Sequence, residues 1–76
     1  MQKFDKFYRI FKAEINALES SGYILVSKYV DITIQLHRFV NKSNGNRVVV
    51  IVDSYHCYYL IIKNNNVVKE FSLEST

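Results

Sequence analysis

Apolar residues in the first twenty positions recur at helical spacing. They stand three or four residues apart, at Phe4, Phe7, Tyr8, Phe11, Ile15 and Leu18. On a helix with 3.6 residues per turn, such positions share one face about 100° wide. The pattern predicts an amphipathic helix from about residue 2 to residue 20. It ends before Gly22, because glycine adopts a left-handed cap at little cost.

The opposite side of this helix is polar and unevenly charged, with basic residues in its first half and acidic residues near its end. That order opposes the helix macrodipole, which favours acidic residues at the start and basic residues at the finish. If the aromatic stripe is core, Ile10 lies off it and is expected to be exposed among basic neighbours. The sequence therefore predicts a surface for a heterologous, acidic protein partner. Its residues are Lys3, Lys6, Arg9, Ile10 and Lys12.

After Gly22 the apolar spacing becomes alternating, and β-branched and aromatic residues dominate. The alternation predicts strands at about 23–29, 32–40, 47–52, 55–62 and 67–73. Asn44-Gly45 favours a hairpin turn, because both residues tolerate positive φ. No turn signal stands at Val30 and Asp31, so one long bent strand is an alternative to the first two. The sequence predicts an α+β fold, with one N-terminal amphipathic helix packed on a four- or five-stranded antiparallel meander sheet.

The third and fourth strands are apolar at both odd and even positions, within 48–52 and 58–62. Strands of this kind lie in the middle of a sheet that is covered on both faces. A single helix of about 19 residues is roughly 28 Å long and covers one face. We expect a second copy of the chain to cover the other, in a homodimer. The alternatives are a different protein, a stacked nucleic acid, or a sheet that curls into a half-barrel.

Composition limits the class of protein. A chain of 76 residues forms one domain, and 49% hydrophobic with 22% charged residues indicates a globular fold. The single Cys57 excludes an internal disulfide framework and a cysteine-rich zinc module. No uncharged apolar segment has the length of a signal peptide or a membrane span. We expect a cytoplasmic protein with no membrane partner.

The amino-acid composition adds a hypothesis about the source. Phe, Tyr, Met, Ile, Asn and Lys, whose codons are AT-rich, make up 34 of the 76 residues, whereas Gly, Ala, Arg and Pro make up 7. An AT-rich genome follows, and the short chain favours a phage or another mobile element. A phage-encoded protein of this kind would act in the cytoplasm of the host cell.

No pattern in the sequence predicts catalysis or metal binding. A metal site needs three or four converging ligands, and the adjacent His56 and Cys57 are expected to point to opposite faces of a strand. A Cys57 nucleophile paired with His37 lacks a glycine-rich elbow and oxyanion donors. We expect a protein that is not an enzyme and that holds no cofactor or metal.

The leading hypothesis is a small non-enzymatic binding protein, an inhibitor or regulator that acts by protein–protein interaction. The alternative is a protein that binds single-stranded nucleic acid, because strand tyrosines near basic residues offer rings to the bases and charges to the phosphates. A net charge of +3 is compatible with either acidic partner. The residues of the alternative site are Tyr29, Arg38, Arg47, Tyr58 and Tyr59.

Overall fold

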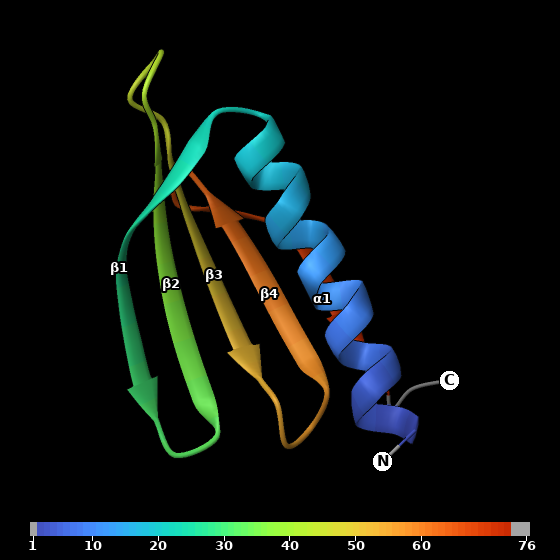
Figure 1. The fold of residues 1–76 in the computed structure, drawn as a ribbon. Helices are drawn as coiled ribbons and strands as arrows, with labels where there is room; N and C mark the ends of the chain where they lie inside the picture. The colour runs from blue at the N-terminus through green and yellow to red at the C-terminus, as the bar shows by residue number, and fades with distance from the viewer. Residues whose placement is uncertain (1, 74–76) are drawn as a thin grey trace.

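The computed structural model describes residues 2–73 and shows one helix on one face of a five-stranded antiparallel sheet (Figure 1). Each strand pairs with the next one along the chain, so β3 is central and β1 and β5 are the edges. This confirms the predicted α+β meander. The elements are α1 (Gln2–Ser20), β1 (Tyr23–Asp31), β2 (Ile34–Asn41), β3 (Arg47–Asp53), β4 (Tyr58–Lys63) and β5 (Asn66–Ser72).

The turn between β1 and β2 decides between two predicted alternatives, and the turn between β3 and β4 differs from the prediction. β1 and β2 are separate strands joined at Ile32 and Thr33, where Ile32 has a φ of 51°, so a single bent strand is excluded. β4 begins at Tyr58 rather than near residue 55, because residues 54–57 form a turn. Asp53 stabilises that turn: its Oδ1 accepts hydrogen bonds from the main-chain N–H groups of residues 55 and 56, at 3.0 and 3.2 Å.

Helix α1 packs on the half of the sheet that contains β4 and β5, and β1, which begins beside the end of the helix, runs away from it in Figure 1. Phe7 lies 6.1 Å from Tyr59 and 6.3 Å from Phe71 between ring centroids, and Phe11 meets the ring of His37 edge-on at 5.8 Å. These aromatic contacts anchor the helix on β2, β4 and β5. Residues 2–20, the described helix, are not apolar enough to cross a membrane.

The buried side of α1 is rotated from the predicted stripe. Ile10 was expected to be exposed but packs on the core, so this prediction was wrong. Phe4 and Tyr8, expected in the core, are 42% and 49% exposed and stack on each other. A polar contact accompanies the rotation. Glu14, one turn after Ile10 on the same side, accepts a hydrogen bond of 2.7 Å from the Tyr59 hydroxyl, so this side of the helix faces the sheet.

Alternation along the strands divides their apolar residues between two faces. The face under α1 holds the core, which includes Phe39 of β2, Val50 of β3 and Tyr59 of β4, each no more than 1% exposed. The residues between them point to the other side of the sheet, where no helix lies (Figure 1). The structure therefore shows a sheet with one covered face and one uncovered face over residues 2–73.

Candidate binding surface

The uncovered sheet face is apolar at its centre. The pairing of β2, β3 and β4 places Leu36, Ile51 and Leu60 in one row across the strands. In the next row, Val49 and Ile62 lie beside Arg38. The apolar members of both rows are half-buried. We call this surface the open face; on β2–β4 it consists of Ile34, Leu36, Arg38, Val40, Arg47, Val49, Ile51, Asp53, Tyr58, Leu60 and Ile62.

The two ends of the open face carry opposite charges. Arg47 begins β3 and Asp53 ends it, about 20 Å apart at the usual rise of a strand. Arg38 pairs with Val49 and so lies in the half that contains Arg47. Glu70 of β5 pairs with Leu60 and lies in the half that contains Asp53. The face is therefore basic near the β2–β3 hairpin and acidic near the β3–β4 turn.

A shallow depression of about 780 Å³ lies at the basic end of the open face. Two arginines, Arg38 and Arg47, flank it, and Val40, Val49 and Ile62 provide apolar walls. The β4–β5 turn closes one side. The depression therefore offers apolar contacts to a side chain of a partner and positive charge to an anionic group.

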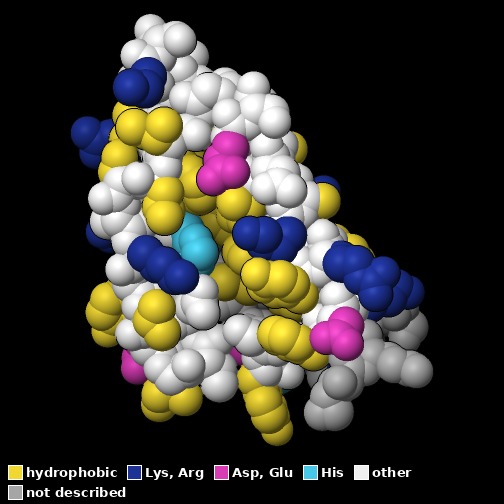
Figure 2. All heavy atoms as spheres, viewed as in Figure 1, with side chains coloured by type: hydrophobic (Ala, Val, Ile, Leu, Met, Phe, Trp, Pro, Cys, Tyr) yellow, Lys and Arg dark blue, Asp and Glu magenta, His cyan; other side chains and the backbone are white. Residues whose placement is uncertain are grey.

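Strand β1 is exposed on both of its sides. Every residue in it except Tyr23 is exposed. Leu25 and Val30 pair with Phe39 and Gln35 and belong to the helix side of the sheet, whereas Tyr29 pairs with Leu36 of the open face. Figure 2 shows the helix side, where hydrophobic side chains gather at the surface between the helix and the first strands. A long apolar edge strand is a template for pairing with another chain.

Sequence reasoning missed β1 as a candidate surface. The signal was present, because Ile24, Leu25 and Val26 are consecutive apolar residues and Lys28 is the one charged side chain before Asp31. Nothing in the sequence showed that the helix would lie over the opposite half of the sheet and leave this strand uncovered.

Four of the five residues predicted for nucleic-acid binding reach the surface. Tyr29, Arg38 and Arg47 are exposed, and Tyr58 is half-buried on the open face. Tyr59 is fully buried on the covered face, so no base can reach its ring, and it does not belong to this site. The Tyr58 hydroxyl donates a hydrogen bond of 2.7 Å to a carboxylate oxygen of Glu70. This bond raises the pKa of Tyr58 and places a negative charge beside its ring.

The basic residues predicted as a partner surface lie on the outer side of α1. Lys3, Lys6, Arg9 and Lys12 are all exposed. Ile10 differs from them, because it is half-buried and packs against the core. The structure thus leaves the four cations exposed on the helix, with Ile10 partly covered beside them.

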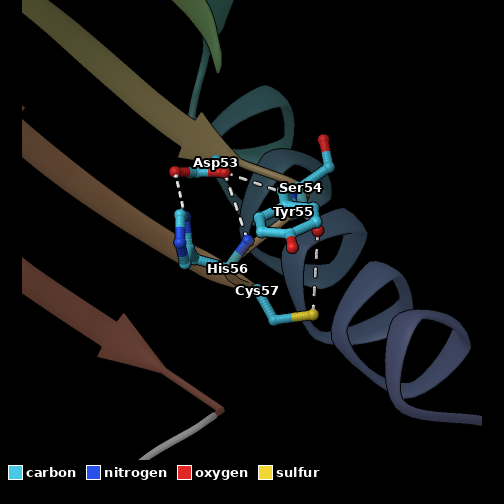
Figure 3. A network of polar contacts seen from close by, with 5 residues as sticks. All are labelled: Asp53, Ser54, Tyr55, His56 and Cys57. Carbon is cyan, nitrogen blue, oxygen red and sulfur yellow. Dashed lines mark hydrogen bonds and ion pairs between the residues drawn. The ribbon is translucent and has the colours of Figure 1, made fainter. Parts of the chain in front are cut away.

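The turn between β3 and β4 contains His56 and Cys57, two of the residues considered for metal or thiol chemistry (Figure 3). His56 Nδ1 lies 2.8 Å from Asp53 Oδ2, and this contact holds the pKa of the Asp53 carboxyl below its usual range. Cys57 is buried, and its thiol points away from His56 toward the Ser54 carbonyl oxygen at 3.8 Å. Both residues lie in a turn, so the expectation that a strand would separate them was wrong. Among residues 2–73, no three potential ligands form a metal-binding group.

The covered face holds one imidazole among residues 2–73, that of His37 in β2. It stacks on Phe39, with ring centroids 6.5 Å apart, and its Nε2 lies 3.1 Å from Gln35 Oε1. Burial, and secondarily the positive charge of Lys28, lower the pKa of His37 from its ordinary value of 6.5. The ring is therefore part of the core, not of a reactive cluster.

These surfaces are suited to binding. The open face offers apolar side chains to a partner, and β1 offers apolar side chains and main-chain groups. The polar pairs Tyr58–Glu70, His56–Asp53 and His37–Gln35 are contacts within the fold. Comparisons of the chain with protein-family models, with curated proteins and with solved structures find no match.

Proposed function

We propose that this chain is a small non-enzymatic binding protein that forms a homodimer and occupies a surface of another protein, as an inhibitor or regulator. One observation carries the proposal: α1 covers one face of the sheet, so the open face and β1 both remain uncovered. Contiguous apolar patches beyond a few hundred Å² usually mark interaction sites on soluble proteins. The open face suits contact with a second copy, and the outer edge of β1, which has no neighbouring strand, suits contact with a different protein.

Charge supports an acidic partner for the second contact. The chain has a net charge of +3, and four cations lie on the outer side of α1. Complementary charge speeds the encounter between two proteins and selects the orientation in which they meet. The excess of residues with AT-rich codons supports an origin in a phage or another mobile element, whose small proteins would meet host proteins in this way.

The contact with a different protein is tested by comparing the two edge strands. Val26 in β1 and Val68 in β5 are both unpaired bulge residues, and they are 53% and 56% exposed. A partner is captured from host lysate on the immobilised chain, identified and purified. We expect Val26→Lys to weaken its binding about tenfold or more, and Val68→Lys, the matched control, to leave it unchanged. Equal effects of the two substitutions would exclude β1 as the contact.

A second candidate function, the binding of single-stranded nucleic acid, is favoured by the depression between Arg38 and Arg47. Tyr29 and Tyr58 lie on the same face, but Glu70 beside Tyr58 repels phosphate. Fluorescence anisotropy with short oligonucleotides at two salt concentrations tests this candidate, because phosphate binding weakens as salt rises. Absence of binding at low salt would exclude it.

A further inference from the structure

We infer that the open faces of two copies pack together about a two-fold axis that runs across the strands, so that Arg47 of each copy lies over Asp53 of the other. The inference rests on the proposed homodimer and specifies its geometry. Three features of the open face support it: its area, the charges at the ends of β3, and the depression at its basic end.

The area of the open face suits a weak but specific dimer. Five strands spaced by about 4.8 Å, with seven residues rising about 3.3 Å each, give a flat footprint of roughly 550 Å². Two copies would then bury about 1,100 Å², which is just above the minimum of about 1,000 Å² for a specific interface. We therefore expect dissociation on the order of micromolar concentrations.

The charges of β3 select the orientation. Sheets that pack face to face usually keep their strands aligned within about 30°, which leaves two kinds of two-fold axis. An axis parallel to β3 would place Arg47 over Arg47 and Asp53 over Asp53. An axis across the strands exchanges the two ends and opposes unlike charges. Because like charges that face each other in an interface disfavour association, the second axis is the stable choice.

The same axis matches the apolar rows at the centre of the face. It exchanges the row that contains Ile51 and Leu60 with the row that contains Val49 and Ile62. Ile51 then lies over Val49 of the other copy, and Leu60 lies over Ile62. On β3 and β4 each apolar residue near the axis therefore meets an apolar residue, as the core of a stable interface requires, whereas on β2 Leu36 meets Arg38 of the other copy.

The shape of the face fits this arrangement as well. The depression lies at the basic end, and Ile34 and Tyr58 stand in the row of Asp53 at the acidic end. Ile34 is 46% exposed. The axis across the strands carries these two side chains over the depression of the other copy, so that a projection meets a hollow at both ends of the dimer.

Cross-linking through a cysteine introduced at one end of β3 tests the orientation. Sedimentation velocity at micromolar concentration first establishes whether the chain dimerises. Arg47→Cys and Asp53→Cys are then treated, separately and mixed, with a short bismaleimide that spans the ~10 Å between packed sheets. We expect a cross-linked dimer in the mixture and none with either variant alone. The wild type is the control, because its single cysteine, Cys57, is buried.

Each other outcome has a defined meaning. Cross-linking of Arg47→Cys alone would indicate the axis parallel to the strands and would overturn the inferred geometry, but it would leave the proposed homodimer intact. A dimer that no mixture cross-links would do the same. A monomer at all concentrations would overturn both.

A charge variant tests the contact without adding a cysteine. Asp53→Asn keeps an oxygen that can accept the amide hydrogens of the turn but removes the charge. We expect it to raise the dissociation constant of the dimer about tenfold, because the two-fold axis makes the contact twice and each exposed ion pair contributes about threefold. Glu19→Gln on α1, remote from the face, is the control and is expected to cause no change. A dissociation constant that Asp53→Asn leaves unaltered would contradict the Arg47–Asp53 contact.

Discussion

The two sides of β3 place nearly identical residues in opposite surroundings. Val48, Val50 and Val52 lie on the covered face and are at most 3% exposed. Val49 and Ile51, which alternate with them, lie on the open face and remain half-buried. Residue type does not separate the two groups, since all five are β-branched and apolar. Strand register and the position of the helix decide which of them become core.

The largest contrast is expected on α1, between an aromatic residue that meets the sheet and one that does not. Phe7→Ala is expected to lower the free energy of unfolding by about 3–5 kcal/mol, because it leaves a cavity between Tyr59 and Phe71. Phe4→Ala should cost about 1 kcal/mol or less. Urea unfolding followed by circular dichroism measures both. Similar losses would contradict the rotation of the helix.

The next contrast concerns assembly. Ile51→Lys places a charge at the centre of the open face, where the second copy is proposed to pack. We expect it to weaken dimerisation by about 2–4 kcal/mol, because the ammonium group would be buried against apolar side chains. Val68→Lys, on the edge strand β5, is expected to leave dimerisation unchanged. Sedimentation equilibrium gives both values, and equal weakening would place the interface elsewhere.

A matched pair on adjacent residues of β3 sharpens the comparison further. Val50→Thr buries a hydroxyl without a partner and should lower the free energy of unfolding by about 1–3 kcal/mol. Val49→Thr should cost about 0.5 kcal/mol or less in the monomer. Urea titrations at protein concentrations below and above the dissociation constant of the dimer separate the effect on folding of the monomer from the effect on dimerisation. A cost for Val49→Thr that rises with concentration would place Val49 in the interface.

The smallest effect is a pH dependence of the covered face. The folded state lowers the pKa of His37 by burial and by the charge of Lys28. As the pH falls below about 6.5, the unfolded chain therefore binds a proton before the folded one does, and stability declines. We expect this decline between about pH 7 and pH 5 to be smaller than the effects above. It should disappear in His37→Gln but persist in His56→Gln, as urea unfolding across this range would show.

The helix and most turns could be predicted because their signals are local. The apolar spacing of α1 gave its bounds of 2 and 20, and Gly22, the predicted cap, has a φ of 95°. Asn64 and Asn65 adopt positive φ in the turn before β5, as asparagine allows. The turn before β4 contains neither glycine nor proline, so the alternating pattern extended β4 backwards to residue 55. Hydrogen bonds to Asp53, which the pattern cannot register, hold that turn instead.

The candidate surface was predictable only in outline. Strands that are apolar at every position indicated an additional face, and the structure shows it. Which residues lie on it depends on a register that a one-residue shift would invert. Tyr58 and Tyr59 are adjacent and identical, yet one lies on the open face and the other in the core. The error at Ile10 has a similar origin. Helical spacing shows which residues share the apolar side of the helix, but it does not show which part of that side contacts the sheet.

The distance along the chain between α1 and its partners has a consequence for biosynthesis. The strands pair with their sequence neighbours, but Phe7 packs on Phe71 near the end of the last strand. A ribosome adds about 5–20 residues per second, so the roughly fifty residues between the end of α1 and Phe71 take about 3–10 seconds to appear. During that interval the strands that bury the helix are still being synthesised. The aromatic side of the first element therefore exists for several seconds before its partner on the last strand, so α1 packs on the sheet late in biosynthesis.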